Sequence, residues 1–154
     1  MSATIESKLA DLGVTLPTPA APAANYVPFV ITGNLVSISG QVPMGPNGLE
    51  FIGKLGDDMD VATGQQAARL CAINILAQAK AALGDLERIV RVVKITGFVN
   101  ATPDFGEQPA VINGASDFLV DVLGEAGTHS RAAVGMGSLP FGVAVEVDAL
   151  IEFK

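Results

Sequence analysis

The sequence predicts an α+β fold in which one mixed β-sheet is covered on one face by two helices. Two long stretches place apolar residues at helical spacing, and stretches rich in β-branched residues flank each of them. After a short N-terminal helix, the predicted order is β-β-α-β-α-β-β, with a pair of strands at each end. Strands that alternate with helices in this way favour a single sheet with the helices packed against it.

Length and composition are consistent with one domain over residues 1–154. A chain of this length can bury a substantial core, and no repeat or linker divides it. Apolar residues make up 49% of the chain and charged residues 16%, which argues against disorder. The apolar share also exceeds what the interior of a small monomer needs. We therefore expect part of the apolar surface to be buried between subunits.

The N-terminal segment combines a short helix with an extended arm. The helix is predicted over residues 2–12, where Ser2 can cap it and Gly13 ends it. Its apolar stripe consists of Ile5, Leu9 and Leu12. Residues 14–25 are rich in proline and alanine, which predicts an extended arm.

Two strands are predicted next, over residues 26–32 and 35–39. They are joined at Gly33-Asn34, a dipeptide that suits the positive φ of a tight hairpin. A glycine-rich loop follows as far as Gly56. The sequence therefore predicts that the sheet begins with an antiparallel pair.

The middle of the chain contains both long helices. The first is predicted to start at Asp60 or Thr63 and to end near Leu83, because a glycine follows directly. Residues 89–99 are rich in β-branched side chains and predict a strand. The second helix is predicted over residues 105–123, and two glycines then break it.

The last strand alternates strictly. From Phe141 to Phe153, every second residue is apolar, which predicts a half-buried strand with Glu146 on its other face. Upstream, Arg131 opens a short apolar run that ends at Met136, before a turn containing proline. We expect Arg131 and Glu146 to lie on neighbouring strands joined by this turn.

These two residues are the candidates for chemistry. The planar guanidinium of Arg131 suits two-point recognition of a carboxylate, and the alternative is a structural ion pair at the surface. An unpaired carboxylate inside an apolar strand is costly. Glu146 therefore either faces solvent on an outer sheet surface or lines a cleft, where it could orient a water molecule.

Charge and residue counts argue against several other functions. The net charge is −7 and the nine Lys and Arg residues are scattered, which argues against nucleic-acid binding. One cysteine, Cys71, and one histidine, His129, make a metal site improbable, and no phosphate-binding fingerprint predicts a cofactor. Cys71 is expected in the core, and His129 in a loop near the site. No membrane-length apolar run or signal-peptide pattern is present, so we expect a cytoplasmic protein.

The C-terminal segment closely resembles the signature of the Rid (YjgF-like) family of reactive-intermediate imine/enamine deaminases. An arginine followed by two small residues and valine, a Leu-Pro turn and a strand reading Val-Glu-Val-Asp-Ala come in the family's order. Ser39-Gly40-Gln41-Val42-Pro43 matches a second family motif. The resemblance covers about residues 20–153 and implies a chorismate-mutase-like trimer with active sites between subunits. Residues 1–19 would be an extension of this core.

The resemblance also implies roles for individual residues. Arg131 would hold the carboxylate of a small imino acid and Glu146 would orient the hydrolytic water. Further substrate-binding positions are Tyr26, Ser39, Asn113 and Ala133, the last of which stands where many members carry cysteine. The implied reaction is cofactor-free hydrolysis of a 2-aminoacrylate-type imine or enamine to a keto acid and ammonia. A non-enzymatic trimer that binds small carboxylates is the alternative, and an endoribonuclease fits the acidic charge less well.

Overall fold

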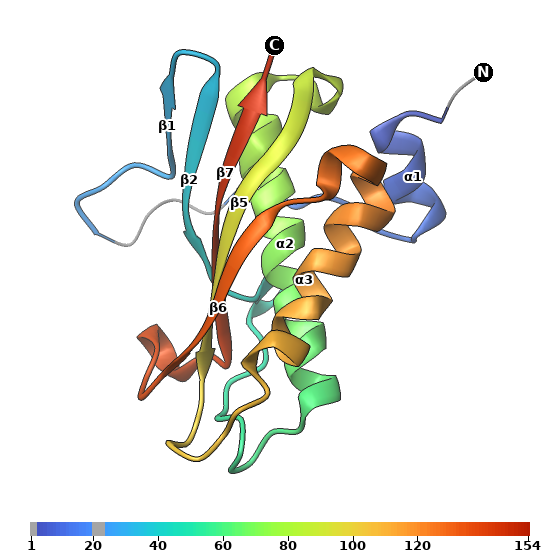
Figure 1. Cartoon of the computed structure of the whole chain (residues 1–154). Helices are drawn as coiled ribbons and strands as arrows, with labels where there is room; N and C mark the ends of the chain where they lie inside the picture. Colours follow the sequence, from blue (N-terminus) through green and yellow to red (C-terminus); the bar gives the residue numbers. More distant parts are fainter. Residues whose placement is uncertain (1–2, 20–23) are drawn as a thin grey trace.

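The computed structural model describes residues 3–19 and 24–154 and contains one five-stranded sheet in the order β1-β2-β7-β5-β6. Its strands are β1 (Phe29–Thr32), β2 (Leu35–Gln41), β5 (Ile89–Asn100), β6 (Ser130–Met136) and β7 (Val145–Phe153). Figure 1 shows α2 (Val61–Leu83) and α3 (Gln108–Leu123) together on one side of this sheet. A separate pair of short strands, β3 (Met44–Gly45) and β4 (Gly48–Leu49), lies in the loop before α2. The predicted sheet with two covering helices is thus confirmed.

Helix α2 begins and ends where local sequence signals place it, whereas α3 begins at Gln108, three residues later than predicted. Asp60 is the N-cap of α2, and its carboxylate accepts a hydrogen bond from the Thr63 amide at 2.8 Å. Gly84 ends the helix with a φ of 79°, in the left-handed region. Between the helices, a Cβ on Gly114 would lie 2.0 Å from the Gln65 carbonyl oxygen. Glycine at that position therefore lets α3 pack directly against α2.

The helix face of the sheet carries the core. Along β7 the buried side chains are Val145, Val147, Ala149 and Ile151. The alternation predicted for this strand is confirmed over these residues, but the strand starts later than predicted. Pro140–Gly142 forms a 3-10 turn, so Phe141 precedes the strand and is exposed. Cys71 on α2 is fully buried against β7, as expected of a small core residue.

The prediction that β6 and β7 are neighbours is wrong, because β5 lies between them. β6 pairs in parallel with β5, whereas β7 pairs antiparallel with β5 on one side and β2 on the other. The connection from β5 through α3 returns the chain, so that β6 is added in parallel at the sheet edge. The C-terminal pair is therefore no hairpin, although the N-terminal pair β1–β2 is one, with Gly33 at a φ of 57° in its turn.

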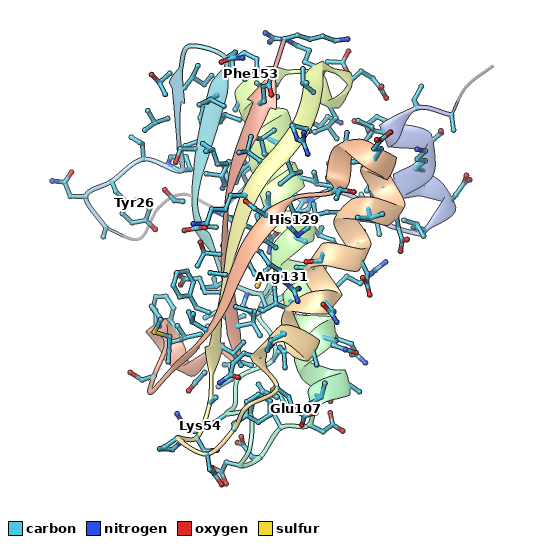
Figure 2. All side chains as sticks on the ribbon, in the orientation of Figure 1. Tyr26, Lys54, Glu107, His129, Arg131 and Phe153 are labelled. Carbon is cyan, nitrogen blue, oxygen red and sulfur yellow. The ribbon has the colours of Figure 1, made fainter. Side chains whose placement is uncertain are left out.

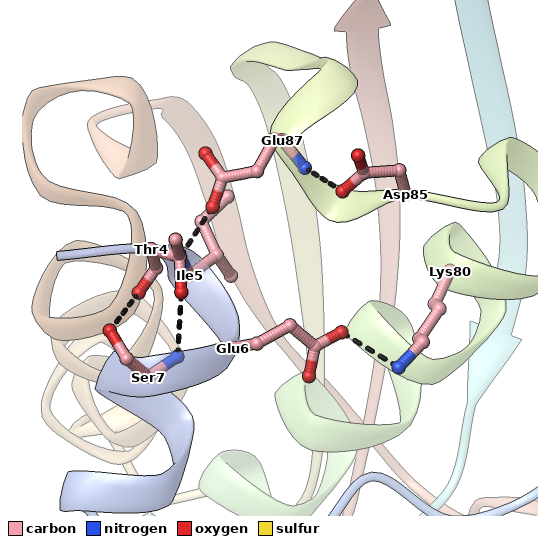
Figure 3. Close-up of polar contacts among 7 residues, drawn as sticks. All are labelled: Thr4, Ile5, Glu6, Ser7, Lys80, Asp85 and Glu87. Carbon is pink, nitrogen blue, oxygen red and sulfur yellow. Dashed lines mark hydrogen bonds and ion pairs between the residues drawn. The ribbon is translucent and has the colours of Figure 1, made fainter.

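The N-terminal helix, α1 (Ile5–Asp11), is attached to the body of the domain by polar contacts (Figure 3). Lys80 of α2 forms an ion pair with Glu6 at 2.7 Å, and Glu87 accepts a hydrogen bond from the amide of Ile5. Thr4 caps the helix by accepting from the amide of Ser7 at 3.0 Å, which replaces the predicted cap. Ser2, the predicted cap, lies outside the described residues. No helix among the described residues is long and apolar enough to cross a membrane.

Candidate active site

The predicted site residues form two groups on opposite faces of the sheet. In the strand register, Arg131 pairs with Ile95, and Ile95 pairs with Ala149. Ile95 and Ala149 are buried under the helices, so this row lies on the helix face of the sheet. Val134 pairs with Phe98 and Phe98 with Glu146, and this row lies on the other face. Neither α2 nor α3 packs on that second surface. Figure 2 shows the separation, with Arg131 between β6 and α3 and Tyr26 beyond the sheet near β1.

Arg131 reaches from β6 to α3. Its Nη1 donates to the Ser116 hydroxyl at 3.1 Å, and its Nη2 donates to the Pro109 carbonyl at 3.2 Å. Asn113 lies four positions after Pro109 and three positions before Ser116, so it shares their face of α3. Its side chain is exposed. Ala133 follows two positions after the arginine and lies on the same face of β6. The structure therefore brings three of the predicted residues together.

His129 and Ser116 hold the arginine in place through a chain of hydrogen bonds. The Gly127 carbonyl can only accept, so His129 Nδ1 donates to it, at 2.6 Å. In the neutral ring Nε2 then accepts from the Ser116 hydroxyl, at 2.9 Å. The hydroxyl oxygen is left to accept from Arg131. His129 thus lies beside the predicted site, and Ser116 is a member that sequence analysis missed.

Among the described residues, the guanidinium of Arg131 has no acidic partner. The ion pair found among the described residues is that of Lys80 with Glu6, and both contacts of Arg131 are to neutral oxygens. Within the described residues of this chain, Arg131 thus forms no structural ion pair. Neutral groups do not compensate the positive charge of this half-buried guanidinium, which is therefore available to bind an anion.

The second group surrounds a cavity of about 690 Å³ at the end of the sheet where β1 stops short of β2. Tyr26, Ser39 and Glu146 all line it. The Ser39 hydroxyl donates to the Val27 carbonyl at 2.8 Å, which fixes the backbone next to Tyr26. The structure thus places the other three predicted residues around one space, and none of them is near Arg131 in the same chain.

A bulge in β2 makes room for the glutamate. The register with β7 shifts between Ile38 and Gln41, and Gly40 lies in this bulge. A Cβ on Gly40 would lie 2.5 Å from Glu146 Oε2. The carboxylate is therefore packed against the glycine backbone, and a side chain at this position would displace it.

Burial raises the pKa of Glu146 above its ordinary value, and the nearby charge of Asp148 raises it further. The carboxyl is half-buried and faces the cavity. A carboxyl group whose pKa is raised towards neutrality can both accept and return a proton during a reaction. This is the property that a general base for water requires.

Phe141 lines the cavity and is the second residue, after Ser116, that sequence analysis missed, since it was predicted within the final strand. It is 66% exposed and has a φ of 61°, a left-handed conformation that bulky side chains rarely adopt. Such a conformation is associated with functional surfaces when the surrounding structure maintains it. The neighbouring Leu-Pro and Gly residues, which are typical of turns, were the available signal.

The fold and site define an α+β protein with an arginine held by neutral oxygens on one face of its sheet and a half-buried glutamate with a raised pKa on the other. The profile of the family described as "YjgF/chorismate_mutase-like, putative endoribonuclease" matches residues 6–152. The chain therefore belongs to the YjgF/Rid family, which confirms the resemblance seen in its sequence.

Individual relatives cover nearly the whole chain. Protein TCP17 of Trypanosoma cruzi is 51% identical over 99% of this chain and 96% of its own length. The structure of Atu1372 from Agrobacterium tumefaciens, a protein of unknown function, is 56% identical with a TM-score of 0.92, covering 97% of this chain and 92% of that one. The structure of Escherichia coli TdcF with bound serine is 25% identical with a TM-score of 0.65, covering 89% and 94%.

Proposed function

We propose that the protein is a cofactor-free hydrolase of small carboxylate-bearing imines and enamines, which it converts to keto acids and ammonia. The observation that carries the proposal is a pair of complementary groups. One is a guanidinium without an acidic partner in the described part of the chain, and the other is a half-buried carboxyl with a raised pKa. Serine bound to TdcF supports an amino-acid-like ligand in this family. No step of the reaction requires a metal or an organic cofactor.

The chemistry follows from the two side chains. Arg131 binds the substrate carboxylate, and an enamine first gains a proton from the solvent at its terminal carbon to become the protonated imine. Glu146 accepts a proton from water as the oxygen bonds to the imine carbon and the C=N electron pair moves to nitrogen. The same proton then passes to the nitrogen of the carbinolamine. The C–N bond breaks as its electron pair leaves with ammonia, the hydroxyl oxygen forms the C=O bond of the keto acid, and Glu146 accepts the hydroxyl proton and returns it to the solvent. General-base help of this kind contributes roughly 10²- to 10⁴-fold in rate.

The two groups work together if they come from different subunits. Arg131 and Glu146 face opposite sides of one sheet, so a complete site needs the β6 edge of one chain against the cavity of its partner. Exposed Val134 on that edge and exposed Phe141 at the cavity support such a contact. Contacts between two different surfaces close into rings, and we propose the homotrimer that the family resemblance implies.

Two variants test the reaction and the shared site together. Glu146→Gln should keep affinity for pyruvate but lose about 10²-fold or more in ammonia release from freshly generated 2-aminoacrylate. Arg131→Ala should lose both the affinity for pyruvate and the release of ammonia. When the two inactive variants are mixed and reassembled, about a quarter of the sites combine an intact arginine with an intact glutamate, so activity should return. Lack of recovery, or a monomer mass by light scattering, would contradict the shared site.

Two other functions remain as outcomes of the same assay. A carboxylate-binding trimer without catalysis would bind pyruvate through Arg131 and release no ammonia even as wild type. The family description also names endoribonuclease activity, which the net charge of −7 disfavours because phosphate binding needs basic surface. Cleavage of labelled RNA by the wild-type protein and not by E146Q or R131A would support that function instead.

A further inference from the structure

The hydrogen bonds behind the guanidinium of Arg131 all run in one direction. Arg131 Nη1 donates to the Ser116 hydroxyl, and that hydroxyl donates to Nε2 of the neutral His129 ring. The other ring nitrogen donates to the Gly127 carbonyl oxygen, where the chain of bonds ends. Aligned hydrogen bonds polarise one another. The chain therefore strengthens the Ser116 oxygen as an acceptor for the guanidinium.

The two ring nitrogens of His129 have separable contacts. Nδ1 bonds a residue two positions earlier, at the end of the 3-10 turn Gly124–Gly127, which is a local structural contact. Nε2 instead reaches Ser116 on α3, 13 positions away in the chain. Figure 2 shows His129 and Arg131 beside this helix. The shape of the turn does not depend on the Nε2 contact, so maintenance of the turn does not account for it.

Ser116 has a competing acceptor in its own helix. A serine inside a helix can donate to the backbone carbonyl four positions earlier, which for Ser116 is the carbonyl of Ile112. Among the described residues, the Ser116 hydroxyl instead bonds His129 and Arg131. Donation to the helix backbone would turn the side chain towards that backbone. His129 thus draws the hydroxyl proton to itself and keeps the oxygen directed at the guanidinium.

The guanidinium keeps enough donors for a ligand. Arginine has five N–H groups, and two of them bond Ser116 and Pro109 among the described residues, which leaves three. Two donors suffice for a bidentate contact with a carboxylate. The Pro109 oxygen belongs to the backbone, whereas the Ser116 oxygen depends on a side-chain rotamer. The position of Nη1 is therefore the one that requires a further residue to define it.

We propose that His129 is a positioning residue for carboxylate binding. By accepting the Ser116 proton, it fixes Nη1 of Arg131 in the orientation that makes a two-point contact with a substrate carboxylate. The inference rests on the proposed function, since it concerns the anchor of the same reaction. His129 acts through Ser116 and Arg131 and takes no part in the proton transfers at Glu146.

Two substitutions separate the contacts of the ring. His129→Gln keeps an acceptor near the position of Nε2 and gives up the contact with Gly127, whereas His129→Asn keeps a donor near Nδ1 and gives up the contact with Ser116. Calorimetry with pyruvate should show affinity within about twofold of wild type for H129Q and about fivefold weaker for H129N, which loses one hydrogen bond of the chain. A purely structural role at the turn predicts the reverse order.

A double-mutant cycle tests whether His129 acts through Ser116. Ser116→Ala alone should weaken pyruvate binding by about fivefold, and adding H129N should cause no further loss, because the chain is already broken. Independent effects would instead multiply to about 25-fold. The matched control is Thr128→Val, which removes an exposed hydroxyl that forms no hydrogen bond among the described residues and should leave affinity unchanged.

Nitrogen-15 NMR of the wild-type protein tests the direction of the bonds without any substitution. His129 is the one histidine of the chain, so its ring signals are assigned directly. The neutral ring should carry its proton on Nδ1, and a proton on Nε2 would overturn the inference. Wild-type affinity in H129N, or independent losses in the cycle, would also overturn it, and the proposed function stands if R131A still loses pyruvate. If R131A binds pyruvate as tightly as wild type, both fail.

Discussion

Gly40→Ala tests the position of the Glu146 carboxylate, the proposed general base, without changing any charged group. The added Cβ would lie 2.5 Å from Glu146 Oε2 and 2.9 Å from its Cδ. Ordinary contacts of a Cβ are 3.4 Å or longer, so the carboxylate must move by nearly 1 Å. A displacement of about 1 Å can lower the rate of an oriented reaction by about 10²-fold. Gly40 has no positive φ, so alanine adds no backbone strain at this position.

The assay is release of ammonia from 2-aminoacrylate under saturating substrate, with pyruvate affinity measured by calorimetry. We expect kcat to fall by about 10- to 100-fold, while affinity changes little because Arg131 is intact. Gly106→Ala is the matched control, since a Cβ there meets nothing within 4 Å. If G40A retains wild-type kcat, the reaction does not depend on the carboxylate position seen here, and Glu146 is not the base.

Three further predictions concern the arginine and the glutamate. Arg131→Ala should weaken pyruvate binding by about 2–5 kcal/mol in calorimetry, and Arg131→Lys should recover little of it; wild-type affinity in R131A would contradict the anchor. Ser116→Ala removes one of the two bonds that orient the guanidinium, and should raise KM by about fivefold, or ~1 kcal/mol, with kcat nearly unchanged. Because the pKa of Glu146 is raised in the folded protein, its ionisation destabilises the fold as pH rises through that pKa. E146Q should therefore gain Tm at neutral pH and little at acidic pH, where the carboxyl is protonated in both states; an equal gain at both would be inconsistent with the shift.

Local signals account for the parts of the fold that could be predicted. The Asp60 cap and Gly84 end of α2 depend on residues within a few positions of each other, and so does the Gly33 turn. The partner of β6 depends instead on α3 packing back over the sheet, which no short stretch of sequence specifies. A turn-length connection between two strands favours a hairpin, and that expectation failed here.

The site was predictable in its residues and not in its arrangement. Arg131 and Glu146 belong to short motifs whose chemistry is evident from residue type. Their placement on opposite faces follows from the strand order and from register, which are long-range properties. Ser116 has no motif around it, and it is notable only through its contacts in space. Such residues become visible once the helices are placed on the sheet.

If Arg131 and Glu146 act as proposed, the division of the site across the sheet makes assembly a condition for reactivity. A lone folded chain would expose Arg131 at its β6 edge and Glu146 in its cavity, with no substrate able to contact both. Under our proposal, specific activity depends on protein concentration by mass action and falls on dilution below the dissociation constant of the assembly. By the same linkage, a ligand that bridges two chains holds them together. Newly synthesised chains would then have no hydrolytic activity until they assemble with other copies.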